Sequence, residues 1–101
     1  MNIEQFTDKS RSVISAAHME AAKSNHQYVG ALHLLKAIIS EDDGLIKNLL
    51  AKLNVNILNL ESQVNQSLKK IPPVHMQGGS QQVYFGSDAS RILNEALELA
   101  K

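Results

Sequence analysis

Four histidines are the side chains of this sequence best suited to bind a metal or to transfer a proton. They are His18, His26, His33 and His75. No two of them have the HExxH or HxxxH spacing that places two ligands on one face of a helix, and no cysteine is present to complete a site. His33 stands within an apolar stretch, so we expect it to be buried and hydrogen-bonded, with His18 and His26 at the surface or in loops. The histidines therefore predict no metal site.

Nucleophilic catalysis and catalysis by paired carboxylates are also unsupported. Ser12 and His18 are six residues apart, which points them to different faces of a helix, and no oxyanion donor accompanies them. Asp42 and Asp43 are adjacent and precede a helical pattern, where carboxylates stabilise a helix start. The glycine-rich residues 77–80 lack the GxxxxGK[ST] spacing of a phosphate-binding loop. We therefore expect no catalytic residue and no cofactor in this chain, and a small hydrolase is a hypothesis without support.

Size and charge narrow the class of protein further. The chain has 101 residues, enough for one compact domain, with 10 basic and 10 acidic residues and a formal net charge of zero. A duplex nucleic-acid binder usually carries a basic excess. The polar N-terminus does not resemble a signal peptide, and no apolar run reaches the roughly 20 residues that span a membrane. We expect a cytoplasmic protein with neither nucleic acid nor membrane as a partner.

Two segments share one helical register, which indicates an internal repeat. A shift of 79 positions superimposes five apolar pairs: Phe6 and Phe85, Val13 and Ile92, Ile14 and Leu93, Ala17 and Ala96, Ala21 and Ala100. The spacing of these residues is that of one face of an α-helix. Thr7 and Ser87 stand just before the two patterns, and we expect each to cap its helix.

The periodicity elsewhere predicts an all-α fold of five helices, with no strand of useful length. The expected helices span about residues 8–24, 31–40, 44–53, 57–70 and 87–101. We expect Asp43 and Asn56 to cap the third and fourth helices, and the second helix to be the most buried. The leucines of the third helix are expected inside, and Tyr28 and Val29 are expected to pack on the core. Domain boundaries follow as a first repeat over 1–71, a linker over 72–84, and the first helix of a second repeat over 85–101.

Three stretches together resemble the N-terminal domain of ClpB-type AAA+ disaggregase chaperones. They are MNIEQFTDKSRSVI, HQYVGALHLLKAIISEDDG and LKKIPPVHMQGGSQQVYFGSD. The resemblance implies two tandem four-helix Clp N repeats, of which this chain holds one complete repeat and the first helix of the next. It also implies a non-catalytic module tethered to a hexameric ring, whose AAA+ modules bind ATP and Mg²⁺ outside this chain.

The function implied by this resemblance is recognition of unfolded or aggregated polypeptides through an apolar groove near the joint of the repeats. Because later helices of the second repeat lie outside the sequence, we expect part of the fifth helix to be exposed. The expected substrate-binding residues are Thr7, Val83, Tyr84, Phe85, Ile92, Leu93 and Leu97, with Thr7 assigned by the resemblance alone. The alternative is a domain that docks adaptor proteins, as in ClpA- and ClpC-type ATPases. The fifth helix is expected either to fold back onto the first repeat or to associate with another copy of the chain.

Overall fold

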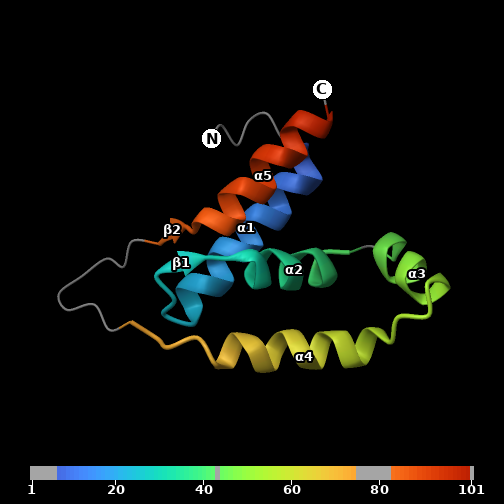
Figure 1. The fold of residues 1–101 in the computed structure, drawn as a ribbon, viewed down its shortest axis with the longest axis horizontal. Helices are drawn as coiled ribbons and strands as arrows, with labels where there is room; N and C mark the ends of the chain where they lie inside the picture. Colours follow the sequence, from blue (N-terminus) through green and yellow to red (C-terminus); the bar gives the residue numbers. More distant parts are fainter. Residues whose placement is uncertain (1–6, 43, 75–82, 101) are drawn as a thin grey trace.

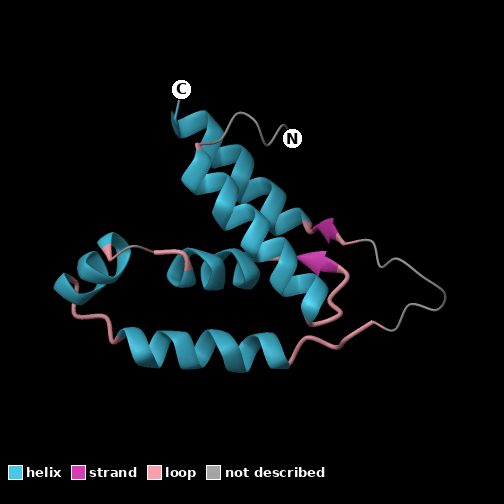
Figure 2. Ribbon diagram, turned by 180° about the vertical axis from the view of Figure 1, so that it is seen from behind, coloured by secondary structure: helices cyan, strands magenta, loops and turns pink. Residues whose placement is uncertain are grey.

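The chain folds into five helices and one pair of short strands within the residues that the structure describes. The structure is a computed structural model that describes residues 7–42, 44–74 and 83–100. Its elements are α1 (Asp8–Lys23), β1 (Tyr28–Val29), α2 (Ala31–Ser40), α3 (Leu45–Lys52), α4 (Ile57–Lys69), β2 (Tyr84–Phe85) and α5 (Ser87–Ala100) (Figure 1; Figure 2). The predicted helical fold class is confirmed. The predictions made for Phe6, Asp43, Lys101 and most of the linker concern positions outside the described residues.

The starts of α1 and α5 keep the predicted register, because they too are 79 positions apart. Thr7 caps α1 as expected: its side-chain oxygen accepts a hydrogen bond from the backbone N–H of Ser10 at 3.1 Å. The predicted capping role of Ser87 is wrong, because Ser87 is already the first residue of α5. The residue before it, Gly86, accepts the hydrogen bond from the Ser90 amide with its carbonyl at 3.0 Å.

The second helix, α2, is the centre of the molecule, as its apolar sequence predicts. It packs against α1, α4 and α5, and it lies between α4 and the pair α1 and α5 in Figure 1. The main core cluster draws residues from α1, α2, β1 and α5: Ile14, Ala17, Ala21, Val29, Leu34, Ala37, Ala89 and Leu93. Because the alanines of α1 are small, α2 can approach α1 closely.

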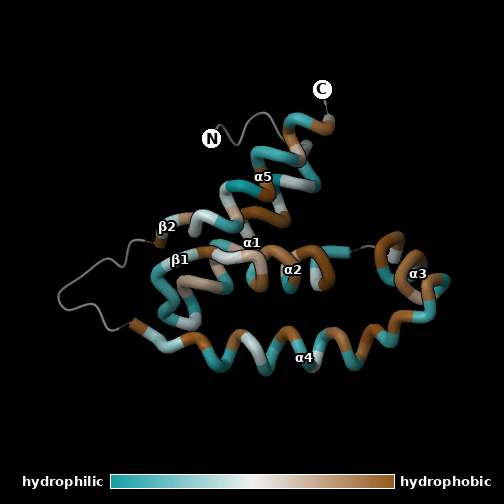
Figure 3. Tube along the Cα trace, viewed as in Figure 1, coloured by the Kyte–Doolittle hydropathy of each residue, from teal (hydrophilic) through white to brown (hydrophobic). Residues whose placement is uncertain are grey.

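The third helix differs from expectation, because none of its residues is buried. Leu45, Leu49 and Leu53 are exposed, and Figure 3 shows the brown, hydrophobic α3 at the edge of the molecule. The predicted inward orientation of these leucines is wrong: an amphipathic period reveals an apolar face but not whether another element covers it. The start of α3 is held by Asp42, whose two carboxylate oxygens accept hydrogen bonds from the amides of Ile46 and Lys47 at 2.9 and 3.0 Å.

The fourth helix, α4, packs against α2. Asn56 caps α4 as predicted, accepting a hydrogen bond from the Asn59 amide at 3.1 Å, and Val64 and Leu68 are buried. Beyond α4, the chain turns back, and the amide of Val74 donates to the carbonyl of Asn25 at 2.7 Å. This contact brings the segment after α4 beside the loop that leads from α1 into β1.

The two short strands join segments that are far apart in the sequence. β1 and β2 are parallel, with Tyr28 opposite Tyr84 and Val29 opposite Phe85. Each strand is followed by a glycine and then a helix, so the tripeptide Tyr–apolar–Gly occurs twice in the same role. Val29 is fully buried, as expected, but Tyr28 is 54% exposed, so its predicted core position is wrong. The reason is the alternation of a strand, which turns adjacent side chains to opposite faces.

Candidate functional site

The joint is the name we use for β1, β2 and the first turns of α2 and α5. Its central polar contact is made by Asp88 of α5, which accepts a hydrogen bond from the backbone amide of Ala31, the first residue of α2, at 3.0 Å. The other carboxylate oxygen accepts from the amide of Ala89 at 2.7 Å. The hydrogen bond from Ala31 holds the pKa of Asp88 below its usual value. One carboxylate therefore caps the start of α2 while belonging to α5.

Two buried histidines lie beneath the joint. Nδ1 of His26 is 2.8 Å from Nε2 of His33, and the amide of Gly30 donates to Nδ1 of His33 at 2.9 Å. His33 is buried and hydrogen-bonded as predicted. His26 lies in the loop between α1 and β1, which agrees with the loop alternative of its prediction, but it is not at the surface, because only 5% of it is exposed. Burial lowers the pKa of His33, and the neighbouring His26 lowers it further, while Glu20 and Asp88 oppose the shift. Both ring nitrogens of His33 are occupied, so this histidine is structural.

The strand part of the expected site lies at the joint. Val83 and Phe85 are half-buried and pack against the core cluster, and the Phe85 ring lies 6.4 Å from that of His18. Tyr84 points the other way and is 47% exposed, with its ring centroid 6.3 Å from that of Tyr28. The structure therefore places two tyrosines side by side on the outer face of the strand pair.

The helical part of the expected site is divided between core and surface. Leu93 is only 8% exposed and belongs to the core cluster, Leu97 is half-buried, and Ile92 is 43% exposed. α5 supplies Leu93 to the core and packs on α2 of the same chain, which is the fold-back arrangement of this helix. Thr7 directly precedes α1, and the start of α1 is the end of this helix that lies far from the strands (Figure 1). The structure therefore does not bring Thr7 and Tyr84 together.

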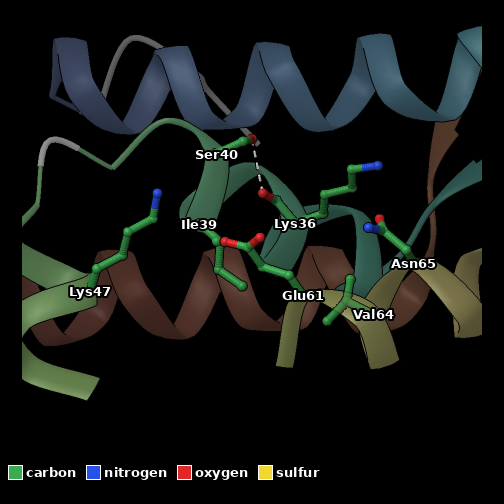
Figure 4. A pocket seen from close by; sticks show the side chains of 7 residues that line it. All are labelled: Lys36, Ile39, Ser40, Lys47, Glu61, Val64 and Asn65. Carbon is green, nitrogen blue, oxygen red and sulfur yellow. Dashed lines mark hydrogen bonds between the residues drawn. The ribbon is translucent and has the colours of Figure 1, made fainter. Parts of the chain in front are cut away.

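A cavity lies between α2, α3 and α4, away from the expected site. It has a volume of about 270 Å³, and Figure 4 shows the seven residues that line it: Lys36, Ile39, Ser40, Lys47, Glu61, Val64 and Asn65. The Ser40 hydroxyl donates to the carbonyl of Lys36 at 2.9 Å, and the Lys36 ammonium pairs with Glu20 at 3.1 Å. The serine of this hollow thus donates its hydrogen bond within its own helix.

Sequence reasoning missed three features of the joint: the strand pairing, the cap from Asp88 and the contact between the histidines. The repeated Tyr–apolar–Gly tripeptide was a usable signal for the pairing, because like segments that enter helices alike can lie side by side. Asp88 carried no such signal, since its partner amide is 57 residues away.

The class that the fold defines is a helical repeat domain, with aromatic and apolar residues at its joint. The profile of the family described as Clp repeat (R) N-terminal domain matches residues 5–101, so the chain belongs to that family. It is 42% identical over its whole length to Chaperone protein ClpB of Rickettsia conorii and equally to that of Rickettsia felis, covering 12% of each. Identity to Chaperone protein ClpB of Mesorhizobium japonicum is 31%, with 11% of that protein covered.

These matches confirm the resemblance drawn from the sequence. The chain corresponds to an N-terminal domain of ClpB and is a chaperone domain of the Clp family. It spans about an eighth of the length of the ClpB relatives that it matches. Among the helices of the described residues, none has the length and hydrophobicity needed to cross a membrane.

Proposed function

We propose that this chain is the substrate-recognition module of a ClpB-like, protein-disaggregating chaperone. In this proposal it binds exposed apolar segments of unfolded or aggregated polypeptides and performs no catalytic step. The observation that carries the proposal is the apolar and aromatic surface left open at the joint and along α5. Tyr28 and Tyr84 form its aromatic part, and Ile92 begins its helical part.

The exposed face of α5 is suited to apolar chains. Ile92, Ala96 and Leu99 are all exposed and follow one another at helical spacing, so they form one apolar row. Covering such a row gains roughly 25 cal/mol per Å² of apolar surface, from which association and ordering costs are subtracted. We therefore expect affinities no tighter than about the micromolar range, which suits transient capture.

The residues expected from the sequence take different parts in this proposal. Tyr84 and Ile92 touch the bound chain, because both are accessible. Val83, Phe85, Leu93 and Leu97 support that surface from the core side. Thr7 acts at the start of α1, as the family resemblance implies.

The remaining functions of such a chaperone are assigned to a longer protein. We propose that ATP and Mg²⁺ bind in its AAA+ modules, that these modules form the hexamer, and that this chain delivers clients to them. The coverage of the relatives, about 12% of their length, is compatible with a module of this kind.

The test is an NMR titration of the chain with a reduced, alkylated lactalbumin as the unfolded client and native lactalbumin as the folded control. We expect shifts over residues 83–97 with the unfolded client alone. Ile92→Glu should weaken binding at least about tenfold, whereas Leu58→Glu, at an exposed leucine of α4, should not. An absence of shifts over 83–97 at high client concentration would overturn the proposal.

A second candidate is docking of a folded adaptor protein, and α3 supplies the observation in its favour. Leu45 and Leu49 of α3 and Leu53, which caps its C-terminal end, are exposed at intervals of four residues and form a compact row. A row of this kind suits a preformed surface of a folded partner. Saturable one-to-one binding of one folded protein, lost in Leu49→Glu and retained in Ile92→Glu, would favour this candidate over client recognition.

A further inference from the structure

The outer edge of β1 carries backbone groups that have no partner among the described residues. The amide of Tyr84 donates to the carbonyl of Gln27 at 3.0 Å, and the amide of Gly86 donates to the carbonyl of Val29 at 2.8 Å. Since backbone groups alternate between the two sides of a strand, the N–H and C=O of Tyr28 face away from β2. Within the described part of the chain, neither group of Tyr28 has a hydrogen-bond partner. This residue therefore offers one donor and one acceptor at a sheet edge.

A cavity of about 330 Å³ lies along the same segment. Its lining combines the β1 segment, the start of α2, the chain after α4, and Asp88: His26, Gln27, Tyr28, Gly30, Ala31, Leu32, His33, Ile71, Pro72, Val74 and Asp88. No β2 residue lines it, and in Figure 1 β2 runs above β1 while the chain after α4 passes below it. Val74, one of the lining residues, donates its amide to the carbonyl of Asn25. Tyr28, whose edge groups have no partner among the described residues, thus lines a hollow together with the chain after α4.

The chemistry of this cavity fits an extended apolar chain. Leu32, Ile71, Pro72 and Val74 give it apolar walls, and the exposed Tyr28 ring stands at its rim. Asp88 is the one carboxylate among the lining residues, and no lysine or arginine is among them. Neutral or basic occupants are therefore favoured over acidic ones. A helix could not satisfy the edge, because its backbone groups are already paired with one another.

We propose that an extended, apolar segment of a non-native polypeptide binds by adding a strand to the outer edge of β1. Its backbone pairs with the N–H and C=O of Tyr28, and its inward side chains enter the cavity beside Ile71 and Leu32. This inference rests on the proposed function, because it specifies how part of a client chain is held. Main-chain pairing is independent of sequence, which suits recognition of many different unfolded proteins.

N-methylated peptides provide a test that leaves the protein unchanged. The probe is a peptide of about six residues with alternating valine and threonine and a lysine at each end. N-methylation at one alternating set of positions removes the donors that face β1, and methylation at the other set removes those that face away. We expect the first to weaken binding about tenfold and the second to leave it unchanged. The amide of Tyr28 should gain protection from hydrogen exchange on binding.

Two variants separate the backbone of Tyr28 from its ring. Tyr28→Pro and Tyr28→Ala both remove the ring, but only Tyr28→Pro also removes the edge N–H, which has no partner among the described residues. We expect the proline variant to bind the peptide about tenfold more weakly than the alanine variant. Circular dichroism reports whether each variant folds, and the methylated peptides decide the question if the proline variant does not.

The outcomes distinguish this inference from the proposed function. Equal affinity for both methylated peptides, with no change at Tyr28, overturns strand addition while client binding along α5 stands. NMR shifts at Tyr28 without shifts at Ile92 support strand addition and overturn client binding along α5. Absence of binding by every peptide and by unfolded lactalbumin overturns both.

Discussion

Nδ1 of His26 and Nε2 of His33 are joined by a hydrogen bond of 2.8 Å, and this contact determines where the protons of both rings reside. Because the Gly30 amide donates to Nδ1 of His33, that nitrogen carries no proton. The proton of His33 is therefore on Nε2, and it is donated to Nδ1 of His26. His33 is neutral in this arrangement, with its proton on the nitrogen that faces His26.

Stability is expected to fall as the pH drops below the ordinary histidine value of 6.5. Burial and His26 hold the folded-state pKa of His33 below that value, so the unfolded chain binds the proton more readily. The contribution of neutral, buried His33 to the free energy of unfolding is fully present above pH 6.5. It is lost as the pH falls through the folded-state pKa. Urea unfolding at pH 7.5 and pH 5.5 measures the difference, with a lower midpoint expected at pH 5.5.

The control for this prediction replaces the titrating ring. His33→Asn should show a smaller change between the two pH values, whereas His18→Asn should behave as the original chain. Asp42 and Asp88 do not interfere in this window, because the pKa of each carboxyl lies below 3.8. Nitrogen-15 spectra of the rings give an independent result, and a protonated Nδ1 on His33 at pH 7.5 would contradict the assignment.

Removing the carboxylate of Asp88 is expected to destabilise the joint. Asp88→Ala leaves the amide of Ala31 without its acceptor, at a cost of about 1 kcal/mol in the free energy of unfolding. The matched control is Asp8→Ala at the first turn of α1, where the carboxylate is exposed and pairs with the nearby Arg11. Urea unfolding of the two variants should rank Asp88→Ala as clearly less stable, and equal midpoints would contradict the capping role.

The two glycines of the repeated Tyr–apolar–Gly tripeptide are expected to differ in tolerance. A Cβ at Gly86 would lie 3.1 Å from a carboxylate oxygen of Asp88 and 3.2 Å from the carbonyl oxygen of Val29. At Gly30 the nearest atom would be 3.5 Å away, an ordinary contact. We expect Gly86→Ala to cost about 1–2 kcal/mol and Gly30→Ala less than about 1 kcal/mol. Thermal unfolding of both variants measures which substitution costs more stability. A larger loss of stability in Gly30→Ala than in Gly86→Ala would contradict the prediction.

Substitutions of Thr7 can separate its capping role from its proposed part in client handling. Both Thr7→Asn and Thr7→Ser retain a side-chain oxygen for the Ser10 amide, so each should keep stability within about 0.5 kcal/mol. Thr7→Ala should lose about 1 kcal/mol. If the hydroxyl takes part in client handling, only the asparagine variant loses affinity for unfolded lactalbumin while remaining stable. Unchanged affinity in that variant would confine Thr7 to the cap.

The helices were predictable because their signals are local. Apolar spacing and the caps Thr7 and Asn56 act within one or two turns, so the start of α1 and that of α4 agree with the structure. The exposure of Leu49 was not predictable, because burial depends on whether a second element reaches that face. The candidate site followed the same division: the sequence singled out Tyr84 and Ile92, which the structure leaves exposed, but it gave no sign of the edge at Tyr28. A two-residue strand is too short to show alternation, and its partner is distant in sequence.

The contact between Ala31 and Asp88 also sets an order of events for folding. These residues are 57 positions apart, so their hydrogen bond closes a loop that contains α2, α3 and α4. The chain entropy lost on closing such a loop is recovered only when the enclosed helices are already compact. The packing of α1, α2 and α4 should therefore precede closure of the joint, and the same contact should be the first to open. A transient state with α5 detached would then expose Leu93 without unfolding the rest, so the chain could vary its apolar surface through a local equilibrium.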